Sequence, residues 1–399
     1  MKKIRDPIHN YIEVDDAALA VINTPRFQRL RRVHQLGTAN LVYPGANHSR
    51  FEHSLGAYHL ARLAGRALGV PADEALDLAL AALLHDVGHG PLSHLTDRIL
   101  RESFGHEHVG ISRALVLGEP FRDALAARGA DPVRVADLLV GKGRLGELIA
   151  GAIDVDRMDY LVRDGHYTGV NIGVDLHRLV HEFRLTRDGL ALHVSGLAAA
   201  EMLLTTRFMM YTTVYFHPTC RIAEGMQERA LMLAVEAGEI EPRALPTLDD
   251  AEVLVALRRS ATPARGLQEA LDRRDLMKLA SAFAADEIAP EALGPLVDHP
   301  AAAARAEAAI ASRAGVPPHA VIVDAAEPPV AAPPDVRVVD DDGNVTSLAD
   351  ASHLVAHLGE AQRDHWRLRV FAWAADRPRV ARAARDVLAR GQGLKAGSL

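Results

Sequence analysis

Apolar residues recur at three- and four-residue spacing through most of the first half of the chain, and this periodicity constrains the fold more than any other feature of the sequence. It predicts helices over 16–23, 26–35 and 51–68. Ser49 and Glu52 have the spacing of a capping box at the start of the third of these helices. Aromatic residues make up only 5% of the chain, so Leu, Ala and Val must build the core, and this mixture favours helix over sheet. We therefore predict a mainly α fold.

The rest of the chain continues the helical pattern with a few breaks. Further helices are predicted over 71–84, 107–126, 131–140, 144–163, 175–183, 196–235, 249–286 and 301–313. A short hairpin is predicted from the alternating segments 183–186 and 190–194. The Pro-rich stretch 327–335 cannot be helical and is predicted to be a linker or a rigid crossover. Beyond it, strands are predicted at 336–339, 345–348 and 368–373. A helix near 352–363 and a last helix after 373 are predicted as well, so the chain is predicted to end in a small α+β lobe.

Charge and cysteine content exclude several classes of protein. The formal net charge of −7 excludes a generally basic nucleic-acid coat, and we expect no nucleic-acid partner. Cys220 is the single cysteine and cannot form an internal disulfide or, by itself, a zinc finger. The first ten residues lack the apolar core of a signal peptide, and the longest apolar run, near 78–84, is far shorter than the roughly 20 residues that cross a bilayer. We therefore expect a cytoplasmic protein without a membrane partner.

Histidine and aspartate residues occur in four separated pieces of the predicted helices, and together they suggest a metal site. The four pieces are 50–53, 84–94, 104–107 and 154–164, and two His and two Asp drawn from them could hold an ion. Two imidazoles and two carboxylates form a nitrogen and oxygen ligand set, which suits Mn, Fe, Co, Ni or Zn and tolerates Mg. Four protein ligands on an octahedral ion leave positions for water and a phosphate oxygen, as metal-assisted hydrolysis requires.

A stripe of polar residues lies along the last of these pieces. Asp156, Tyr160 and Asp164 are spaced i, i+4 and i+8 and therefore lie on one face. Arg157 and Arg207, together with Arg50, can supply positive charge for a polyphosphate.

These residues resemble a known superfamily. The ordered set of His53, His85-Asp86 and Asp156 resembles the HD phosphohydrolases, which are named after the His-Asp pair. Five further segments narrow the resemblance to the deoxynucleoside triphosphate (dNTP) triphosphohydrolases, and in particular to the catalytic core of the dNTPases that combine a SAM domain with an HD domain. These segments are 6–9, 24–31, 35–37, 49–56 and 85–91. The resemblance implies an HD-domain catalytic core over 1–240, a helical extension over 241–326 and the α+β lobe over 327–399.

The resemblance also implies a reaction and a set of roles. Members of this branch use a mononuclear metal and metal-activated water to cleave dNTP at the α-phosphate, giving a deoxynucleoside and inorganic triphosphate. The metal ligands implied here are His53, His85, Asp86 and Asp156. The residues implied to be catalytic are His89, His94 and His106. The residues implied to contact the phosphates are Arg50, Arg157, Tyr160 and Arg207, and those implied to hold the sugar and base are Gln35, Leu36, Asp164 and Tyr215. A nucleotide effector would contact Lys2, Asn23, Gln28 and Arg31. A homo-oligomer, either a dimer or a tetramer, is implied as well.

The sequence departs from the family pattern at three of these positions. Arg157 replaces a Lys and keeps the charge, and Tyr211 replaces a His one turn after Arg207. Asn23 replaces the Asp that reads guanine in the activating site. Because Asn lacks that charge, another effector or none is an open alternative.

Three functions remain distinguishable at this point. The first is a metal-dependent dNTP triphosphohydrolase. The second is an HD phosphohydrolase of another nucleotide or phosphoester, with the same metal site and a different sugar pocket. The third is a nucleotide-binding regulator with vestigial hydrolysis. The identity of the metal, and the presence of a second Mg²⁺ carried by the nucleotide, stay open.

Overall fold

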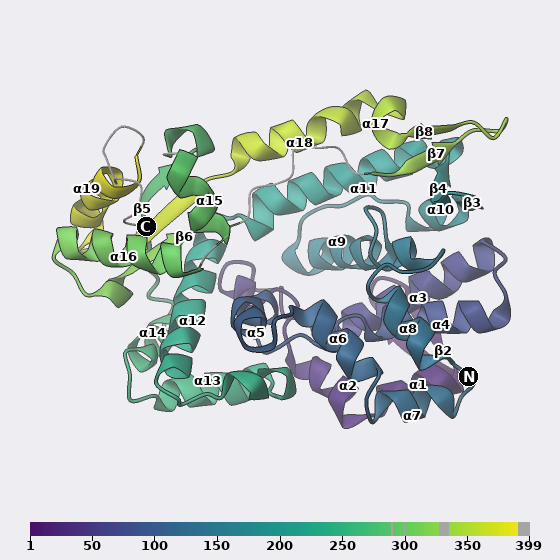
Figure 1. Ribbon diagram of the computed structural model, residues 1–399, viewed down its shortest axis with the longest axis horizontal. Coiled ribbons are helices and arrows are strands. Elements are labelled where there is room, and N and C mark those ends of the chain that lie inside the picture. The colour runs from purple at the N-terminus through teal and green to yellow at the C-terminus, as the bar shows by residue number, and fades with distance from the viewer. Residues whose placement is uncertain (289, 299, 327–334, 390–399) are drawn as a thin grey trace. The chain divides into compact units, whose positions relative to one another are not determined.

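The computed structural model describes residues 1–288, 290–298, 300–326 and 335–389 (Figure 1). The chain divides into two compact units. The first contains residues 1–210, 241–253 and 335–356, and the second contains 211–240, the described part of 254–332, and 357–389. The predicted linker falls, apart from Asp335, outside the described residues.

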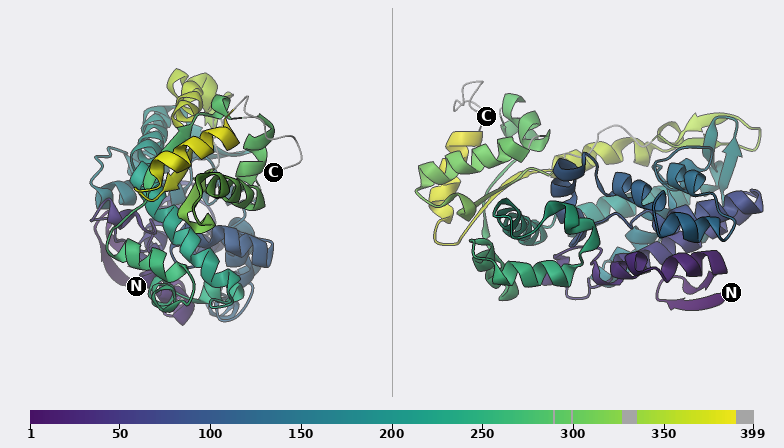
Figure 2. Two further views of the ribbon diagram at one scale, coloured as in Figure 1. Left: turned by 90° about the vertical axis from the view of Figure 1, so that its left-hand side faces the viewer. Right: turned by 60° about the horizontal axis from the view of Figure 1, so that its bottom comes forward.

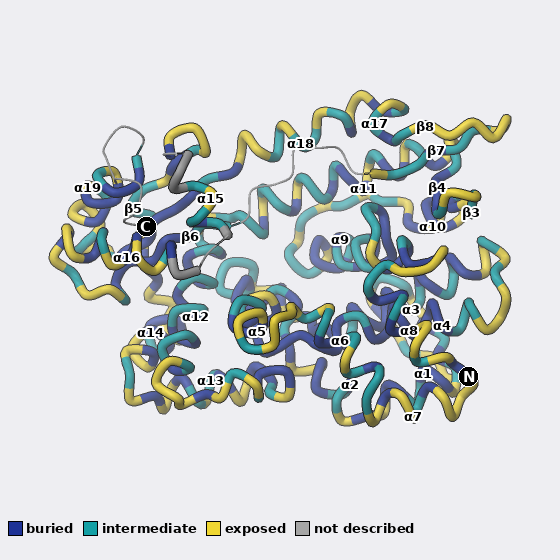
Figure 3. Tube along the Cα trace, in the orientation of Figure 1, coloured by how far each residue is buried: buried dark blue, intermediate teal, exposed yellow. Residues whose placement is uncertain are grey.

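The first unit is mostly helical. Its helices are α1 (Asp16–Ile22), α2 (Pro25–Arg29), α3 (Arg50–Ala67), α4 (Ala72–Leu84), α5 (Asp97–Phe104), α6 (His108–Val116), α7 (Phe121–Ala126), α8 (Pro132–Leu138), α9 (Val155–Thr168), α10 (Leu176–His181), α11 (Leu197–Met210) and α17 (Leu348–Ala351). Helices α3 and α4 pack together, and α3 also contacts α9. Figure 3 shows that α3 and the second half of α4 are buried over most of their length. These helices therefore form the centre of the unit.

The predicted signals account for the ends of these central helices. The Ser49 amide donates to the Glu52 carboxylate at 2.6 Å, which confirms the capping box at the start of α3. Gly69, at φ +62°, follows the end of the helix in the left-handed region that favours glycine. Helix α4 ends at Leu84, directly before His85 and Asp86. The ends of α3 and α4 thus carry three of the candidate ligands.

Two small sheets complete the first unit. Strands β1 (Lys2–Asp6) and β2 (Asn10–Val14) form an antiparallel hairpin. Strands β3 (Phe183–Thr186) and β4 (Gly189–His193) form the predicted hairpin, with Phe183 opposite Leu192. This hairpin is extended by β7 (Arg337–Val339), parallel to β4, and then by β8 (Val345–Ser347). The strands predicted near 336–339 and 345–348 are confirmed.

The second unit holds an α+β lobe. Its strands form the order β5 (Lys278–Phe283), β9 (Leu368–Ala372), β6 (Val321–Asp324). Its helices are α12 (Pro218–Glu236), α14 (Ala264–Asp272), α15 (Pro290–Asp298), α16 (Pro300–Ala314) and α19 (Arg377–Leu388), while α13 (Asp250–Arg259) and α18 (His353–His365) run from the first unit into the second.

Alternation along the strands places helices on both faces of this sheet. Val321 and Val323 point into a buried cluster with α16 and α19, whereas Ile322 faces Gly225 of α12. Figure 2 shows α16 and α19 beside the sheet. The prediction of a mainly α fold with a small α+β lobe is confirmed. The predicted domain boundaries at 240 and 326 stay a prediction.

Several predicted helices were wrong in part. The helix predicted over 107–126 divides into α6 and α7. Helix α9 begins at Val155 instead of 144, because Asp154 caps it by accepting from the Arg157 amide at 2.7 Å. The predicted helix over 249–286 contains α13 and α14 but then becomes β5, because pairing with β9 outweighs the helical preference of its Ala and Leu residues. A π-helical turn at Tyr211–Tyr215 interrupts the helix predicted over 196–235. Among the described residues, no helix is long and apolar enough to cross a membrane.

Candidate metal centre and active site

The four predicted metal ligands come from three helix ends. His53 lies in the first turn of α3, His85 and Asp86 directly follow α4, and Asp156 lies in the first turn of α9. Since α3 packs against both α4 and α9, the ends of these helices meet inside the first unit. The structure thus brings all four residues together, and we call this group the metal centre.

The ligand atoms of the metal centre converge closely. The Nε2 atoms of His53 and His85 are 3.1 Å apart. The Asp156 Oδ1 atom is 2.9 Å from the His53 Nε2 atom and 3.4 Å from the His85 Nε2 atom. Metal–ligand bonds of about 2.1 Å place neighbouring ligands about 3.0 Å apart at octahedral angles and about 3.4 Å apart at tetrahedral angles. The observed separations therefore match a coordination shell.

The other ring nitrogens of the two histidines show why a cation fits here. The His53 Nδ1 atom lies 2.9 Å from the Asp159 carboxylate, and the His85 Nδ1 atom lies 2.7 Å from the Ala82 carbonyl oxygen. Both neighbours can only accept, so each Nδ1 carries a proton and each ring presents its Nε2 atom to the centre, as a bare lone pair when the ring is neutral. Two such lone pairs facing each other beside two carboxylates repel unless a cation lies between them. The residues present therefore fit a divalent ion.

A buried network supports His53 from behind. Asp159 accepts from the Arg163 Nε atom at 2.8 Å, and its other oxygen lies 2.6 Å from the His9 Nε2 atom. The Arg163 Nη1 atom reaches Asp6 at 2.9 Å. These four residues did not appear among the predicted site residues. The i, i+4 spacing of Asp159 and Arg163 was the available signal, because a charged pair among apolar helix neighbours indicates a buried interaction.

Charge in the metal centre shifts the pKa values of its members. Burial acts to lower the pKa of His53, but hydrogen bonds to Asp156 and Asp159 outweigh it and raise this pKa to about 10. Burial acts to raise the pKa of Asp86, but the charges of Arg50 and His85 outweigh it and hold this pKa well below its usual range. The carboxylates of the centre therefore remain ionised and favour a positive charge between them, which a proton on His53 supplies until a metal ion displaces it.

Arg50 connects the metal centre to the loop after α4. Its Nη1 atom donates to the Asp86 Oδ2 atom at 2.6 Å and its Nε atom donates to the Ser93 hydroxyl at 2.7 Å. Its Nη2 atom is buried and has no hydrogen-bond partner among the described residues. Arg50 was predicted to contact phosphate, and one of its N–H groups remains available for such a ligand.

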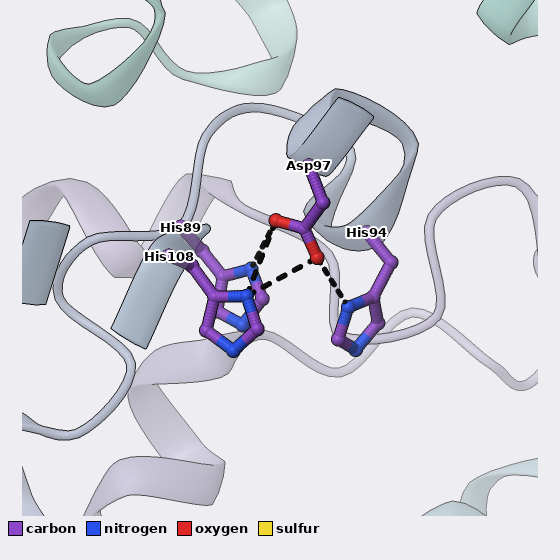
Figure 4. Close-up of side chains that lie close together, drawn as sticks. All are labelled: His89, His94, Asp97 and His108. Carbon is purple, nitrogen blue, oxygen red and sulfur yellow. Dashed lines mark hydrogen bonds and ion pairs between the residues drawn. The ribbon is translucent and has the colours of Figure 1, made fainter. Parts of the chain in front are cut away.

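A second group of histidines lies beside the metal centre, and we call it the distal cluster. It consists of His89, His94, Asp97 and His108 (Figure 4). The rings of His89 and His108 stack at 3.7 Å. The Asp97 carboxylate lies 2.8 Å from the His94 Nδ1 atom and 3.1 Å from the His108 Nδ1 atom. The His89 Nε2 atom lies 3.3 Å from the Asp86 Oδ1 atom, so the two groups are adjacent.

His106 lies apart from the distal cluster. The structure places it in the exposed segment between α5 and α6, whereas His108, the first residue of α6, stacks on His89. His108 was not among the predicted site residues. The signal that could have found it is the pair of histidines two residues apart at a helix start, either of which could face the loop. The catalytic role of His106 stays a prediction.

Residues predicted to hold the sugar and base partly converge. Asp164 is buried and lies 2.8 Å from the Nε2 atom of His48, whose ring stacks on Tyr167. The Gln35 amide donates to the His48 carbonyl at 3.0 Å, and its side-chain Oε1 atom is buried without a partner among the described residues. Leu36 follows Gln35 and is half-buried. Gln35 and Asp164 are therefore both held by His48, which the sequence interpretation missed.

The remaining predicted substrate residues lie at different places. Tyr160 is on α9 with its ring 6.3 Å from that of His53. Arg157 turns toward the start of its own helix, where it contacts Asp154 and the Gly151 carbonyl. Arg207 lies in the last turn of α11, which packs against α9. Tyr215 belongs to the π-helical turn in the second unit.

The predicted effector residues form a small group on the first unit. The Arg31 Nε atom donates to the Gln28 Oε1 atom at 2.9 Å, and the Arg31 guanidinium lies 3.5 Å from the centre of the Phe51 ring. Asn23 is exposed at the end of α1, and Lys2 is exposed on β1. Gln28 and Arg31 are therefore together, and their role stays a prediction.

Comparisons with known proteins agree with this site. Residues 50–164 match the HD domain, and residues 174–393 match the HD-associated region. The chain is 39% identical over 243 residues to the uncharacterized protein YwfO of Bacillus subtilis, covering 58% of this chain and 55% of that protein. It is 30% identical over 308 residues to the human deoxynucleoside triphosphate triphosphohydrolase SAMHD1, covering 64% of this chain and 49% of that protein.

A solved structure extends the likeness over nearly the whole chain. A phosphohydrolase from Bacteroides thetaiotaomicron matches with a TM-score of 0.74 and 25% identity, covering 93% of this chain and all of that one. The chain spans about half the length of the curated relatives it matches. It belongs to the HD-domain phosphohydrolase family, in the group that carries the HD-associated region.

Proposed function

We propose that this protein is a metal-dependent dNTP triphosphohydrolase, which hydrolyses dNTP to a deoxynucleoside and inorganic triphosphate. The observation that carries the proposal is the pair of imidazole Nε2 atoms, 3.1 Å apart, beside Asp86 and Asp156. The name of SAMHD1, at 30% identity, supports a dNTP as the substrate. The same metal centre would serve another nucleotide or phosphoester, and this remains the alternative.

The residues of the metal centre would hold one divalent ion. When bound, such an ion supplies Lewis-acid chemistry, because it lowers the pKa of water and neutralises phosphate charge. Asp159 keeps the proton of His53 on Nδ1 and so orients the ring. Arg50 donates to Asp86 and directs its remaining N–H group to a phosphate oxygen.

His89 and His94 lie next to this centre and suit proton transfer and charge stabilisation. Burial and the nearby charge of Arg50 hold the pKa of His89 well below its usual range, so its ring is neutral. The one N–H group of this neutral ring, on Nε2, faces Asp86 and can be shared with a phosphate oxygen beside the metal centre without adding a buried charge. His94 is largely exposed and can exchange a proton with solvent, which a general acid requires.

The sugar side of the pocket is assigned to Gln35 and Asp164. Both present buried polar atoms, and Asp164 is held in place by His48. A buried polar atom without a protein partner costs about 1–3 kcal/mol, so the Gln35 Oε1 atom favours a ligand that donates a hydrogen bond. Arg157, Tyr160, Arg207 and Tyr215 are assigned to substrate on the resemblance. The effector contacts, the homo-oligomer and the cytoplasmic location stay predictions.

A product assay on metal-stripped protein tests the proposal. Mn²⁺ or Mg²⁺ is added with each dNTP and each NTP, singly and mixed, and products are separated by chromatography and phosphorus NMR. We expect inorganic triphosphate from dNTPs, and none from Asp86→Asn. The matched control is Asp77→Asn, which changes another buried carboxylate of the α4 region away from the metal centre.

Other products would contradict the proposal in distinct ways. Diphosphate or monophosphate release would move the scissile bond and favour another phosphoester substrate. Binding of nucleotides without turnover under any mixture would favour a regulator. Turnover in Asp86→Asn equal to that of the unmodified protein would remove the metal centre from the reaction.

A further inference from the structure

The distal cluster has the composition of a metal site in its own right. Three imidazoles and one carboxylate approach one another, and one ligand atom from each residue lies within 4.8 Å of the others. The three nitrogens are all Nδ1 atoms directed toward the Asp97 carboxylate (Figure 4). Such a set differs from the metal centre, which offers two imidazoles and two carboxylates. A site richer in imidazole suits Zn²⁺ or Cu²⁺ better than Mg²⁺.

An independent observation is that one buried nitrogen atom of the cluster has no hydrogen-bond partner among the described residues. The His89 side chain is only 1% exposed, and its Nδ1 atom has no hydrogen-bond partner among the described residues. The nearest Asp97 oxygen is 3.8 Å away, too far for a hydrogen bond. His89 presents Nε2 to Asp86, which fixes the proton on that nitrogen and leaves the Nδ1 lone pair bare. A bare, buried lone pair aimed into a cluster of imidazoles favours a cation.

Stacking of the His89 and His108 rings brings their Nδ1 atoms to the same side, near Asp97. His89 and His108 are nearly parallel, with an interplanar angle of 16° and centroids 3.7 Å apart. This arrangement places both Nδ1 atoms near Asp97, while His94 approaches the same carboxylate at 2.8 Å. The Nδ1 protons of His94 and His108 can move to Nε2 through solvent, so both neutral rings can become ligands without a net change in charge.

We propose that the distal cluster is a second cation site, which binds a divalent ion such as Zn²⁺ through the Nδ1 atoms of His89, His94 and His108 and an oxygen of Asp97. Its ligands come from the loop after α4, the turn before α5, the first residue of α5 and the first residue of α6. A bound ion would therefore join the loop after α4, the turn that leads into α5 and the start of α6.

The site also bears on the proposed function. An ion at the distal cluster takes up His89 and His94, so these rings are then unavailable to a phosphate. We therefore expect a second equivalent of Zn²⁺ to lower turnover, and this corollary rests on the proposed function. The binding of an ion to the site does not rest on the proposed function, because it is measured without substrate.

Equilibrium dialysis of the full chain against Zn²⁺, with metal measured by mass spectrometry, tests the proposal. We expect two tight sites in the unmodified protein, and one in His94→Asn and in His108→Gln. His94 is 68% exposed, so its replacement should leave the fold intact. His106→Gln is the matched control, since it changes a neighbouring histidine outside the cluster, and it should keep two sites. Asp86→Asn should keep the distal one.

Hydrogen exchange gives a second readout that does not depend on counting ions. Zn²⁺ should slow amide exchange in the segment 93–108 of the unmodified protein and of His106→Gln, but not in His94→Asn. A single Zn²⁺ site in the unmodified protein, or two sites that persist in both His94→Asn and His108→Gln, would overturn the proposal. If the unmodified protein binds two Zn²⁺ ions but does not hydrolyse dNTP, that result would count against the proposed function alone.

Discussion

The metal centre and the distal cluster use the same residue types but are built in different ways. In the metal centre, His53 has no exposed surface and is backed by Asp159, which is itself held by Arg163 and His9. In the distal cluster, His94 is 68% exposed and Asp97 alone holds two of the three rings. The first group is fixed before any ligand arrives, whereas the second can adjust around one. A site whose ligands are held by buried neighbours is therefore rigid, whereas a site with an exposed ligand can change its geometry when an ion binds.

Removing a ligand from the metal centre should have the largest effect. His85→Gln takes away one of two bare Nε2 atoms, so we expect metal to be lost and turnover to fall by more than the 10- to 100-fold that an outer contact costs. Metal analysis and turnover measure this. His94→Asn serves as the comparison, and it should keep the first metal. Equal loss of that metal in both variants would mean that the two groups are one site.

Removing the outer carboxylate should have the next largest effect. Asp159→Asn no longer holds the proton on the His53 Nδ1 atom as strongly, so metal affinity should fall by about 10- to 100-fold. Competition with a chelator measures the affinity. Asp6→Asn is the matched control, because Asp6 also binds Arg163 but does not touch His53. A loss in Asp6→Asn as large as in Asp159→Asn would point to general destabilisation instead.

The serine that accepts from Arg50 should matter mainly for stability. Ser93 accepts from the Arg50 Nε atom, so Ser93→Ala leaves a buried donor unpaired and should lower the free energy of unfolding by about 1–3 kcal/mol. Denaturant unfolding measures this value. Ser54→Ala is the control, since the buried Ser54 hydroxyl has no hydrogen-bond partner among the described residues and its loss should be nearly neutral. Equal costs for the two variants would contradict a special role for the Arg50 contact.

The smallest effect should come from His59, whose ring packs against His9. Burial, and then the nearby His9, lower the pKa of His59 to about 4. The unfolded chain, with an ordinary pKa near 6.5, therefore binds the proton first as the pH falls, and folding stability is lost between pH 6.5 and 4. His59→Gln should remove part of that loss, about 1–2 kcal/mol after solvent screening. Urea unfolding at pH 7 and pH 4.5 measures it, and an unchanged pH dependence would contradict the assignment.

Much of the fold and of the metal centre could be predicted because the signals are local. The capping box of α3 and the end of α4 are visible in a few neighbouring residues, and these ends position His53, His85 and Asp86. The third histidine of the distal cluster, His108, was missed. The sequence has both His106 and His108 at this point, and only the start of α6 decides which of them enters the cluster. Local capping residues therefore predict a site better than residue type alone.

The contacts that could not be predicted join distant parts of the chain. His9 meets Asp159 across 150 positions, and His48 meets Asp164 across 116. Strand β5 was missed for the same reason, since its partner β9 lies about 90 residues later and its own residues favour a helix. Such pairings depend on how helices pack, which no short pattern contains.

The turn after the first strand makes the beginning of the chain a working part of the protein. Asp6 and His9 reach Arg163 and Asp159, while Met1 itself is largely exposed. A fusion partner attached ahead of Met1 therefore has room. Trimming the first ten residues, in contrast, would remove Asp6 from Arg163 and His9 from Asp159, and so weaken a buried ion pair. A shortened variant of this protein must therefore keep Asp6 and His9, because they support the helix that carries Asp156 and Asp159.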